Sequence, residues 1–230
     1  MAHRLPAFTL CLALLGPLPI ARAQVVTPVS FDTGPGNLMV VLRESAGANK
    51  QDESLRPYGK LRTTLDNGRE IELEPSWYQY LGDMHLRLVF DSPQSLQSAS
   101  PDDLARLHLA PEQALELAVA NLRRVYGPPS VQPWSGRLMQ VQSASPDLNS
   151  SYFLDRAFWR DLQRDHPRGL VVAVPRRGGL VYAPCEDEIA VDQLRFAVAA
   201  LYAGSGGTRV SSALYLFKDG AWSVFQPPLR

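Results

Sequence analysis

Apolar and polar residues alternate in the first half of the chain in the pattern of half-buried β-strands. The apolar run from Leu38 to Leu42 predicts a buried strand, and the alternation from His85 to Phe90 predicts another. Between them, the alternating segments Lys60–Leu65 and Arg69–Leu73 flank the dipeptide Asn67-Gly68. Because Asn-Gly tolerates positive φ at both positions, this pattern predicts a hairpin with a two-residue turn.

The second half of the chain adds apolar stripes at helical spacing. A helix is predicted from Pro111, which suits a first helical turn, to Gly127, with its buried face at Leu115, Ala118, Val119, Leu122 and Tyr126. A second helix is predicted from Asp187 to Tyr202, with its buried stripe at Leu194, Ala197, Val198 and Leu201. A shorter helix is expected from Ala157 to Arg164.

Pairs of strands separate these helices. The alternating segment Arg137–Gln142 is expected to pair with Ser151–Leu154, and two clearer hairpins follow. Their strands are Leu170–Val174 with Leu180–Tyr182, and Val210–Phe217 with Ala221–Phe225, the last pair around Asp219-Gly220. Consecutive hairpins predict an antiparallel sheet with helices packed on one face, which is an α+β fold. We expect a β-rich part at residues 24–100 and an α+β part at residues 105–230.

Three segments of the second half carry a resemblance to a known family. They are Ala118–Arg123 (AVANLR), Gly169–Pro175 (GLVVAVP) and Val210–Phe225 (VSSALYLFKDGAWSVF), in this order and with a helix between the last two. Over about residues 110–226 the chain resembles the YtpQ-type family of bacterial proteins, a domain of unknown function. The resemblance implies a fold and assigns no activity, substrate or site residue.

The first 23 residues have the pattern of a secretory signal peptide. Arg4 provides a basic start, and the apolar stretch Phe8–Leu18 is too short to cross a membrane. Ala21-Arg22-Ala23 then matches the small-x-small cleavage pattern, so we expect cleavage between Ala23 and Gln24. This predicts export to the periplasm or the medium, with no membrane span after the signal is removed.

Charge and cysteine content restrict the partners and the means of stabilisation. The chain has 23 basic and 23 acidic residues, and loss of Arg4 and Arg22 would leave 21 and 23, a formal charge of −2. Because nucleic-acid-binding proteins carry a basic surface, we expect no nucleic acid partner. Only Cys185 would remain after cleavage, so no intramolecular disulfide can form and the core must stabilise the fold alone.

Candidate chemistry gathers between residues 175 and 188. Arg176 and Arg177 lie in an expected turn, where their guanidinium groups could bind an anion. Cys185 precedes an expected helix whose dipole favours a thiolate, whereas the acidic neighbours Glu186 and Glu188 oppose it. The same residues are also interpreted as solvated charges at a hairpin tip, an inert thiol and acids that complement the helix dipole.

Two function classes follow from these observations. The first is an exported binding or interaction protein with a protein or small-molecule partner. The alternative is a hydrolase-like enzyme with a site at the junction of the hairpin and helix at residues 175–188. The chain contains no phosphate-binding glycine-rich motif and no histidines at metal-ligand spacing, so we expect neither a cofactor nor a metal.

Overall fold

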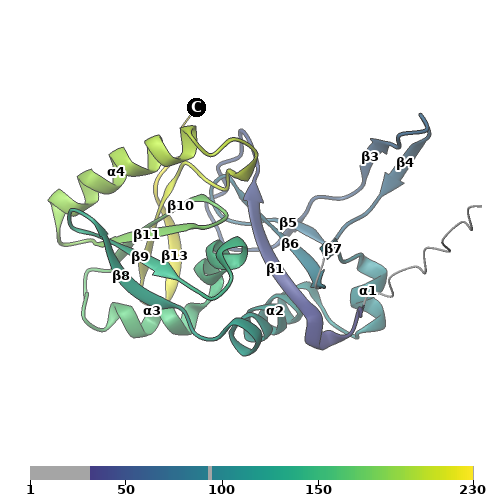
Figure 1. The fold of residues 1–230 in the computed structure, drawn as a ribbon, viewed down its shortest axis with the longest axis horizontal. Coiled ribbons are helices and arrows are strands. Elements are labelled where there is room, and N and C mark those ends of the chain that lie inside the picture. Colours follow the sequence, from purple (N-terminus) through teal and green to yellow (C-terminus); the bar gives the residue numbers. More distant parts are fainter. Residues whose placement is uncertain (1–31, 93–94, 230) are drawn as a thin grey trace, which may run out of the picture. The chain divides into compact units, whose positions relative to one another are not determined.

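The computed structural model describes residues 32–92 and 95–229, so the expected signal peptide and its cleavage site at Ala23-Gln24 lie outside the described residues. The first of two larger sheets uses the first half of the chain (Figure 1). Its strands are ordered β1 (Leu38–Glu44), β6 (Met84–Asp91), β5 (Trp77–Gln79) and β2 (Arg56–Pro57), and β7 (Leu96–Ser98) also pairs with β6. All its strand pairs are antiparallel.

The register of β1 and β6 sorts their side chains onto two faces. Leu38 lies opposite Phe90, Val40 opposite Leu88, and Leu42 opposite Leu86, which gives one face an apolar character. The other face carries Arg43, which lies opposite His85, and Arg87 two residues further along β6. Charged side chains therefore lie on a sheet face that belongs to the inner part of the fold.

The second sheet contains six strands, all paired antiparallel with their neighbours. Their order is β13 (Ala221–Gln226), β12 (Leu214–Lys218), β10 (Leu170–Arg176), β11 (Gly179–Pro184), β9 (Leu138–Gln142) and β8 (Ser130–Ser135). β8 forms one edge, and its register shifts between Pro133 and Ser135. The prediction of an α+β fold built from antiparallel hairpins is confirmed.

Helical segments cover both faces of the second sheet, not one face as expected. α4 (Glu188–Ala203) packs on the face that carries Val171 and Ala173. The 3₁₀ helix η2 (Pro146–Leu154) and the helix α3 (Arg156–Gln163) pack on the opposite face, with Leu170 and Val172. Because β10 is buried on both sides, its sequence is a continuous apolar run with no polar alternation.

The long helices begin and end close to the predicted residues. α2 extends from Pro111 to Tyr126 and packs along β1, and Gly127 follows it with a φ of 76°. α4 starts after Asp187, whose side chain accepts a hydrogen bond from the Ala190 N–H at 3.0 Å and so caps the helix. Short helices lie at η1 (Pro35–Asn37), α1 (Pro101–Arg106) and η3 (Gly206–Thr208).

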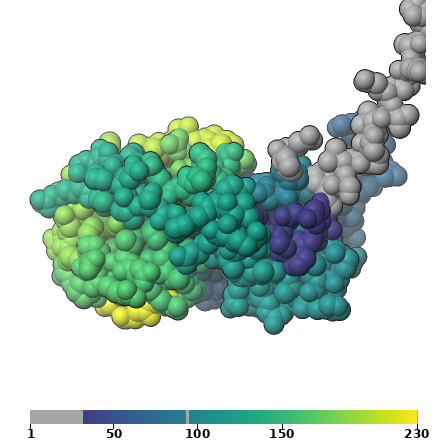
Figure 2. Space-filling view, turned by 60° about the horizontal axis from the view of Figure 1, so that its bottom comes forward, coloured from purple at the N-terminus to yellow at the C-terminus, as the bar shows by residue number. Residues whose placement is uncertain are grey.

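The segment before β1, purple in Figure 2, lies beside the teal region of the chain, where Asn121 of α2 donates to the Pro35 carbonyl.

One of the two dipeptide turns forms as predicted and the other does not. Lys218 pairs with Ala221, so Asp219 and Gly220 make a two-residue turn with φ values of 53° and 78°. In the separate ribbon of β3 (Leu61–Thr64) and β4 (Glu70–Leu73), Leu65 pairs with Arg69 through its N–H, which leaves a three-residue loop. Only Gly68 of that loop takes a positive φ, so the expected two-residue turn is wrong.

The expected strand at residues 151–154 is also wrong. These residues belong to η2, and β9 pairs with β8 and β11 instead. Phe153 of η2 stacks on Trp222 with 3.9 Å between ring centroids, and Trp159 of α3 lies edge-on to the same ring. Aromatic packing under the sheet therefore favours a helical path over strand pairing for this segment.

A buried carboxylate joins the two sheets. Asp83 lies in the turn between β5 and β6 and is 3 % exposed. Its Oδ1 accepts hydrogen bonds from the hydroxyls of Ser211 and Tyr215, and its Oδ2 accepts from the Ser212 N–H at 3.1 Å. Burial raises the pKa of Asp83, although these hydrogen bonds act in the opposite direction. The described residues belong to one compact unit.

The residue before this carboxylate must be glycine. Gly82 has a φ of +60°, and a Cβ atom there would lie 2.6 Å from the Tyr215 hydroxyl oxygen. The tyrosine ring therefore occupies the space that a side chain at position 82 would need. Backbone and side chain together set the distance between the two sheets at this point.

Removal of the joining carboxylate should destabilise the protein strongly. Asp83→Ala removes the shared acceptor of Ser211, Ser212 and Tyr215, and it should lower the free energy of unfolding by about 3 kcal/mol. Urea unfolding followed by tryptophan fluorescence measures this change. Asp66→Ala, in the exposed loop of the β3–β4 ribbon, is the matched control and should change stability by less than about 0.5 kcal/mol. Equal effects of the two substitutions would contradict the role given to Asp83.

Candidate functional site

The residues predicted for one site lie at opposite ends of a hairpin. β10 and β11 pair with Leu170 opposite Pro184 and Arg176 opposite Gly179. Arg176 and Arg177 therefore lie at the closed turn, and Cys185 follows the open end, roughly 20 Å away along the strands. The structure does not bring the arginines together with Cys185, and the expected single cleft at residues 175–188 does not form.

The acidic residues near Cys185 have structural partners. Asp187 caps α4 and also accepts a hydrogen bond from Arg137 Nη1 at 3.0 Å. Glu186 accepts a hydrogen bond from His166 Nδ1 at 3.0 Å, and although burial acts to raise the pKa of Glu186, this contact holds it below its usual value. Glu188 lies exposed in the first turn of α4, where the helix dipole favours an acid. Capping and ion pairing account for Asp187 and for one oxygen of Glu186, whereas Glu186 Oε2 is buried without a partner among the described residues. Cys185 and Glu188 line a separate small pocket that contains neither arginine.

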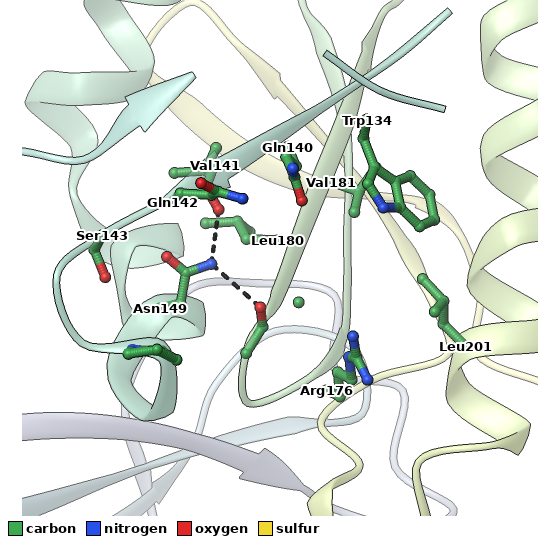
Figure 3. A pocket seen from close by; sticks show the side chains of 13 residues that line it. Trp134, Gln140, Val141, Gln142, Ser143, Asn149, Arg176, Leu180, Val181 and Leu201 are labelled. Carbon is green, nitrogen blue, oxygen red and sulfur yellow. Dashed lines mark hydrogen bonds between the residues drawn. The ribbon is translucent and has the colours of Figure 1, made fainter. Parts of the chain in front are cut away.

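The other end of the hairpin forms part of a polar pocket of about 270 Å³. Side chains from β8, β9, η2 and the β10–β11 turn surround it (Figure 3). The polar groups are the guanidinium of Arg176 and the amides of Gln140, Gln142 and Asn149, and the Trp134 indole forms one wall. The pocket thus offers one positive charge and several amide groups that can donate or accept.

Asn149 is the most constrained of these groups. It is 4 % exposed, and its Nδ2 donates to the carbonyl of Val141 at 2.7 Å and to that of Gly178 at 3.4 Å. Its Oδ1 is buried and finds no donor among the described residues. Because a buried acceptor without a donor costs free energy, this oxygen adds to the cost of burying Asn149 beside the pocket.

An apolar groove continues from the pocket. Trp134 and Leu201 line both cavities, and the groove of about 710 Å³ lies between α4 and the β8–β9 hairpin. Large apolar side chains are unusually open here, with Phe196 80 %, Ile189 58 % and Trp134 38 % exposed. Asp192 and Gln193 of α4 also line the groove. The groove and the polar pocket together form a mixed surface, which we call the groove–pocket surface.

A serine–histidine pair elsewhere lacks the geometry of a nucleophilic site. Ser45 Oγ lies 3.1 Å from His85 Nδ1, but the other ring nitrogen, Nε2, accepts a hydrogen bond from Arg87 Nε at 2.9 Å. A catalytic histidine carries a carboxylate at the second nitrogen, which stabilises the protonated ring. Burial, followed by the charge of Arg87, instead lowers the pKa of His85 to about 3. At neutral pH the His85 ring is therefore neutral and only weakly basic.

Sequence reasoning identified Arg176 and missed the rest of the groove–pocket surface. Ile189 and Phe196 lie seven residues apart on the side of the α4 helix away from the buried Leu194. Two large apolar residues on an expected polar face are the signal that could have indicated the groove. Asn149 carried no such signal, because its role depends on the path of η2.

Within residues 32–92 and 95–229, no group of three or more His, Cys, Asp or Glu side chains is arranged to hold a metal ion. Among the helices of the same residues, none has the length and apolar character needed to cross a membrane. Comparisons with protein-family models, with curated proteins and with solved structures gave no match for the chain. The resemblance to the YtpQ-type family therefore stays a prediction.

The neutral state of His85 should make stability depend on pH. Its folded pKa of about 3 lies below the ordinary value of 6.5, so its contribution is fully present above pH 6.5 and is lost as the pH falls. The free energy of unfolding should fall by about 1.4 kcal/mol for each pH unit below this value. Urea unfolding between pH 7 and about pH 5, above most carboxylate titrations, measures the slope.

His85→Gln should flatten this slope, because the titrating ring is gone. His108→Asn is the matched control, since His108 is exposed and has a φ of 57°, which asparagine tolerates. This control should keep the slope of the natural protein. An unchanged slope in His85→Gln would contradict the assignment.

Proposed function

We propose that this protein is an exported binding protein without catalytic turnover, and that its groove–pocket surface holds an extended segment of a partner protein. The observation that carries the proposal is the continuity of the apolar groove with the polar pocket through Trp134 and Leu201. A ligand that fills both must combine apolar side chains with polar groups at a short distance. An extended peptide presents apolar side chains and polar backbone groups within a few residues of one another.

The apolar half of the surface supports a protein partner. Phe196 and Ile189 leave most of their side-chain surface uncovered by the described residues. Contiguous exposed apolar side chains beside a polar rim are typical of protein interaction sites. A bulky apolar residue of the partner would fit between Trp134 and Phe196. It would remove both aromatic rings and its own side chain from water.

The polar half supports an extended segment that carries an acidic group. The side-chain amides of Gln140 and Gln142 line the pocket and can hydrogen-bond the backbone of an extended segment. Arg176 is exposed and forms no ion pair among the described residues, so its guanidinium is available to a carboxylate. A peptide with an apolar residue followed by an acidic residue or by its C-terminal carboxylate would place one group in the groove and the other beside Arg176.

The export part of the proposal rests on the sequence. The basic start, the short apolar stretch and the Ala21-Arg22-Ala23 pattern support a cleaved signal. The absence of turnover is supported by the separation of Arg176 from Cys185 and by the low pKa of His85. Arg176 is not placed to activate the Cys185 thiol, and His85 is too weak a base to activate Ser45. The hydrolase-like alternative therefore gains no support from geometry.

Peptide selection tests the proposal directly. The chain from Gln24 onward, immobilised and exposed to a displayed peptide library, should enrich peptides that combine a bulky apolar residue with an acidic residue. Phe196→Ala should weaken binding of a selected peptide by about tenfold or more, and so should Arg176→Gln, which removes the charge that pairs with the carboxylate. Fluorescence anisotropy with the labelled peptide measures both changes.

Leu73→Ala is the matched control, because Leu73 is 49 % exposed but lies on the β3–β4 ribbon away from the groove. It should leave the affinity unchanged. Phe196→Ala should also keep the unfolding midpoint of the natural protein, since an exposed side chain adds little to stability. Failure to enrich any peptide, or equal affinity in Phe196→Ala and Leu73→Ala, would overturn the proposal.

A further inference from the structure

Three arginines act on one another electrostatically, since burial and then the charges of Arg177 and Arg87 lower the pKa of Arg43, and burial and the charge of Arg177 lower that of Arg87. Arg43 and Arg87 lie on one face of the first sheet, since Arg43 pairs with His85 and Arg87 follows two residues later. Arg177 comes from the second sheet, and Arg176 beside it lines the pocket that Arg177 does not line. The three residues therefore come from β1, β6 and the β10–β11 turn.

Backbone contacts hold Arg177 near β1. The Arg177 carbonyl accepts from the Ser150 N–H at 2.9 Å, and the next residue, Ser151, donates its hydroxyl to the Val40 carbonyl of β1 at 2.7 Å. The Arg177 N–H donates to the Thr208 carbonyl at 3.1 Å. The Arg177 backbone is thus held between η2 and the segment before β12. Through Ser150 and its neighbour Ser151, it is connected to β1 by two hydrogen bonds.

Arg87 is held in one orientation. Its guanidinium carbon lies 3.5 Å from the centroid of the Trp77 ring, and its Nε donates to His85 Nε2 at 2.9 Å. The neutral His85 ring therefore accepts from Arg87 and adds no charge of its own. The two terminal nitrogens of Arg87 form no hydrogen bond to other described residues, which leaves their donors for a ligand.

No ion pair within the described residues compensates the charge of the cluster, although Arg43 Nη1 donates to the Leu42 carbonyl at 2.7 Å and Arg177 Nη2 donates to the Gly207 carbonyl at 3.4 Å. Arg43, Arg87 and Arg177 form no ion pair with the carboxylates of the described residues, and the Arg177 Nε is buried without an acceptor there. Burial and then the charges of Arg177 and Arg87 lower the pKa of Arg43 to about 10, against the opposing effect of the exposed Asp147. Three guanidinium groups thus repel one another where a bound anion would neutralise them.

The geometry points to a binding site for a phosphoryl group at Arg43, Arg87 and Arg177. A carboxylate has one charge and is satisfied by a single bidentate arginine. A phosphoryl group carries up to two charges and three acceptor oxygens, which matches donors from three separate elements. The site is independent of the groove–pocket surface, because it uses Arg177 and the first sheet and none of the groove residues.

Titration calorimetry with inorganic phosphate tests the site. At constant ionic strength, phosphate should bind the chain from Gln24 onward and acetate should not. Arg43→Gln and Arg177→Gln should each weaken phosphate binding by about tenfold or more. Arg69→Gln, exposed on the β3–β4 ribbon, is the control and should bind phosphate like the natural protein.

Stability distinguishes a lost ligand site from a damaged fold. Without phosphate, Arg43→Gln should unfold at the same or a higher temperature than the natural protein, because it removes repulsion. Phosphate should raise the unfolding temperature of the natural protein and of Arg69→Gln more than that of Arg43→Gln.

Vesicles separate the two sources of a phosphoryl group. Binding to inorganic phosphate supports a free or soluble phosphoryl ligand, and binding only to phosphatidic acid vesicles, lost in Arg43→Gln, supports a lipid headgroup. Binding to neither, or equal binding by Arg43→Gln, Arg177→Gln and Arg69→Gln, would overturn the proposal.

Discussion

The fold depends on a carboxylate buried where the two sheets meet. Asp83 accepts hydrogen bonds from Ser211, Ser212 and Tyr215, which lie more than a hundred residues later in the chain. A buried acid of this kind is tolerated only when several donors surround it, so the turn before β6 and the start of β12 can meet in a single arrangement. The positions of β1 and of η2, which is bonded to β1 through Ser151, follow from this junction.

The same arrangement brings the two proposed surfaces to one turn. Arg176 lines the polar pocket, and its neighbour Arg177 lies beside the arginines of the first sheet. Arg176 is the last residue of β10 and Arg177 the first residue of the turn, and the two consecutive arginines have different surroundings. The Arg-Arg pair is therefore better understood as two separate features than as one double charge at a hairpin tip.

Local features of the fold could be predicted from the sequence, and features made by distant residues could not. The helices at Pro111 and after Asp187 and the turn at Asp219-Gly220 depend on neighbouring residues, and each forms as expected. The 3₁₀ path of residues 146–154 depends on aromatic packing under the sheet, which no local pattern reveals. Of the binding surfaces, Arg176 and Arg177 were identified by residue type, whereas Asn149, Phe196 and Arg43 acquire their roles only through tertiary contacts.

The edge strand β8 also affects how this protein behaves at high concentration. An unpaired edge next to exposed apolar side chains is the usual starting point for sheet-to-sheet growth between molecules. Pro133 has no N–H to offer a neighbouring strand, and the register shift between Pro133 and Ser135 interrupts the ladder. This proline removes one donor from the β8 edge beside the groove and so disfavours the pairing of that edge with a strand of another molecule.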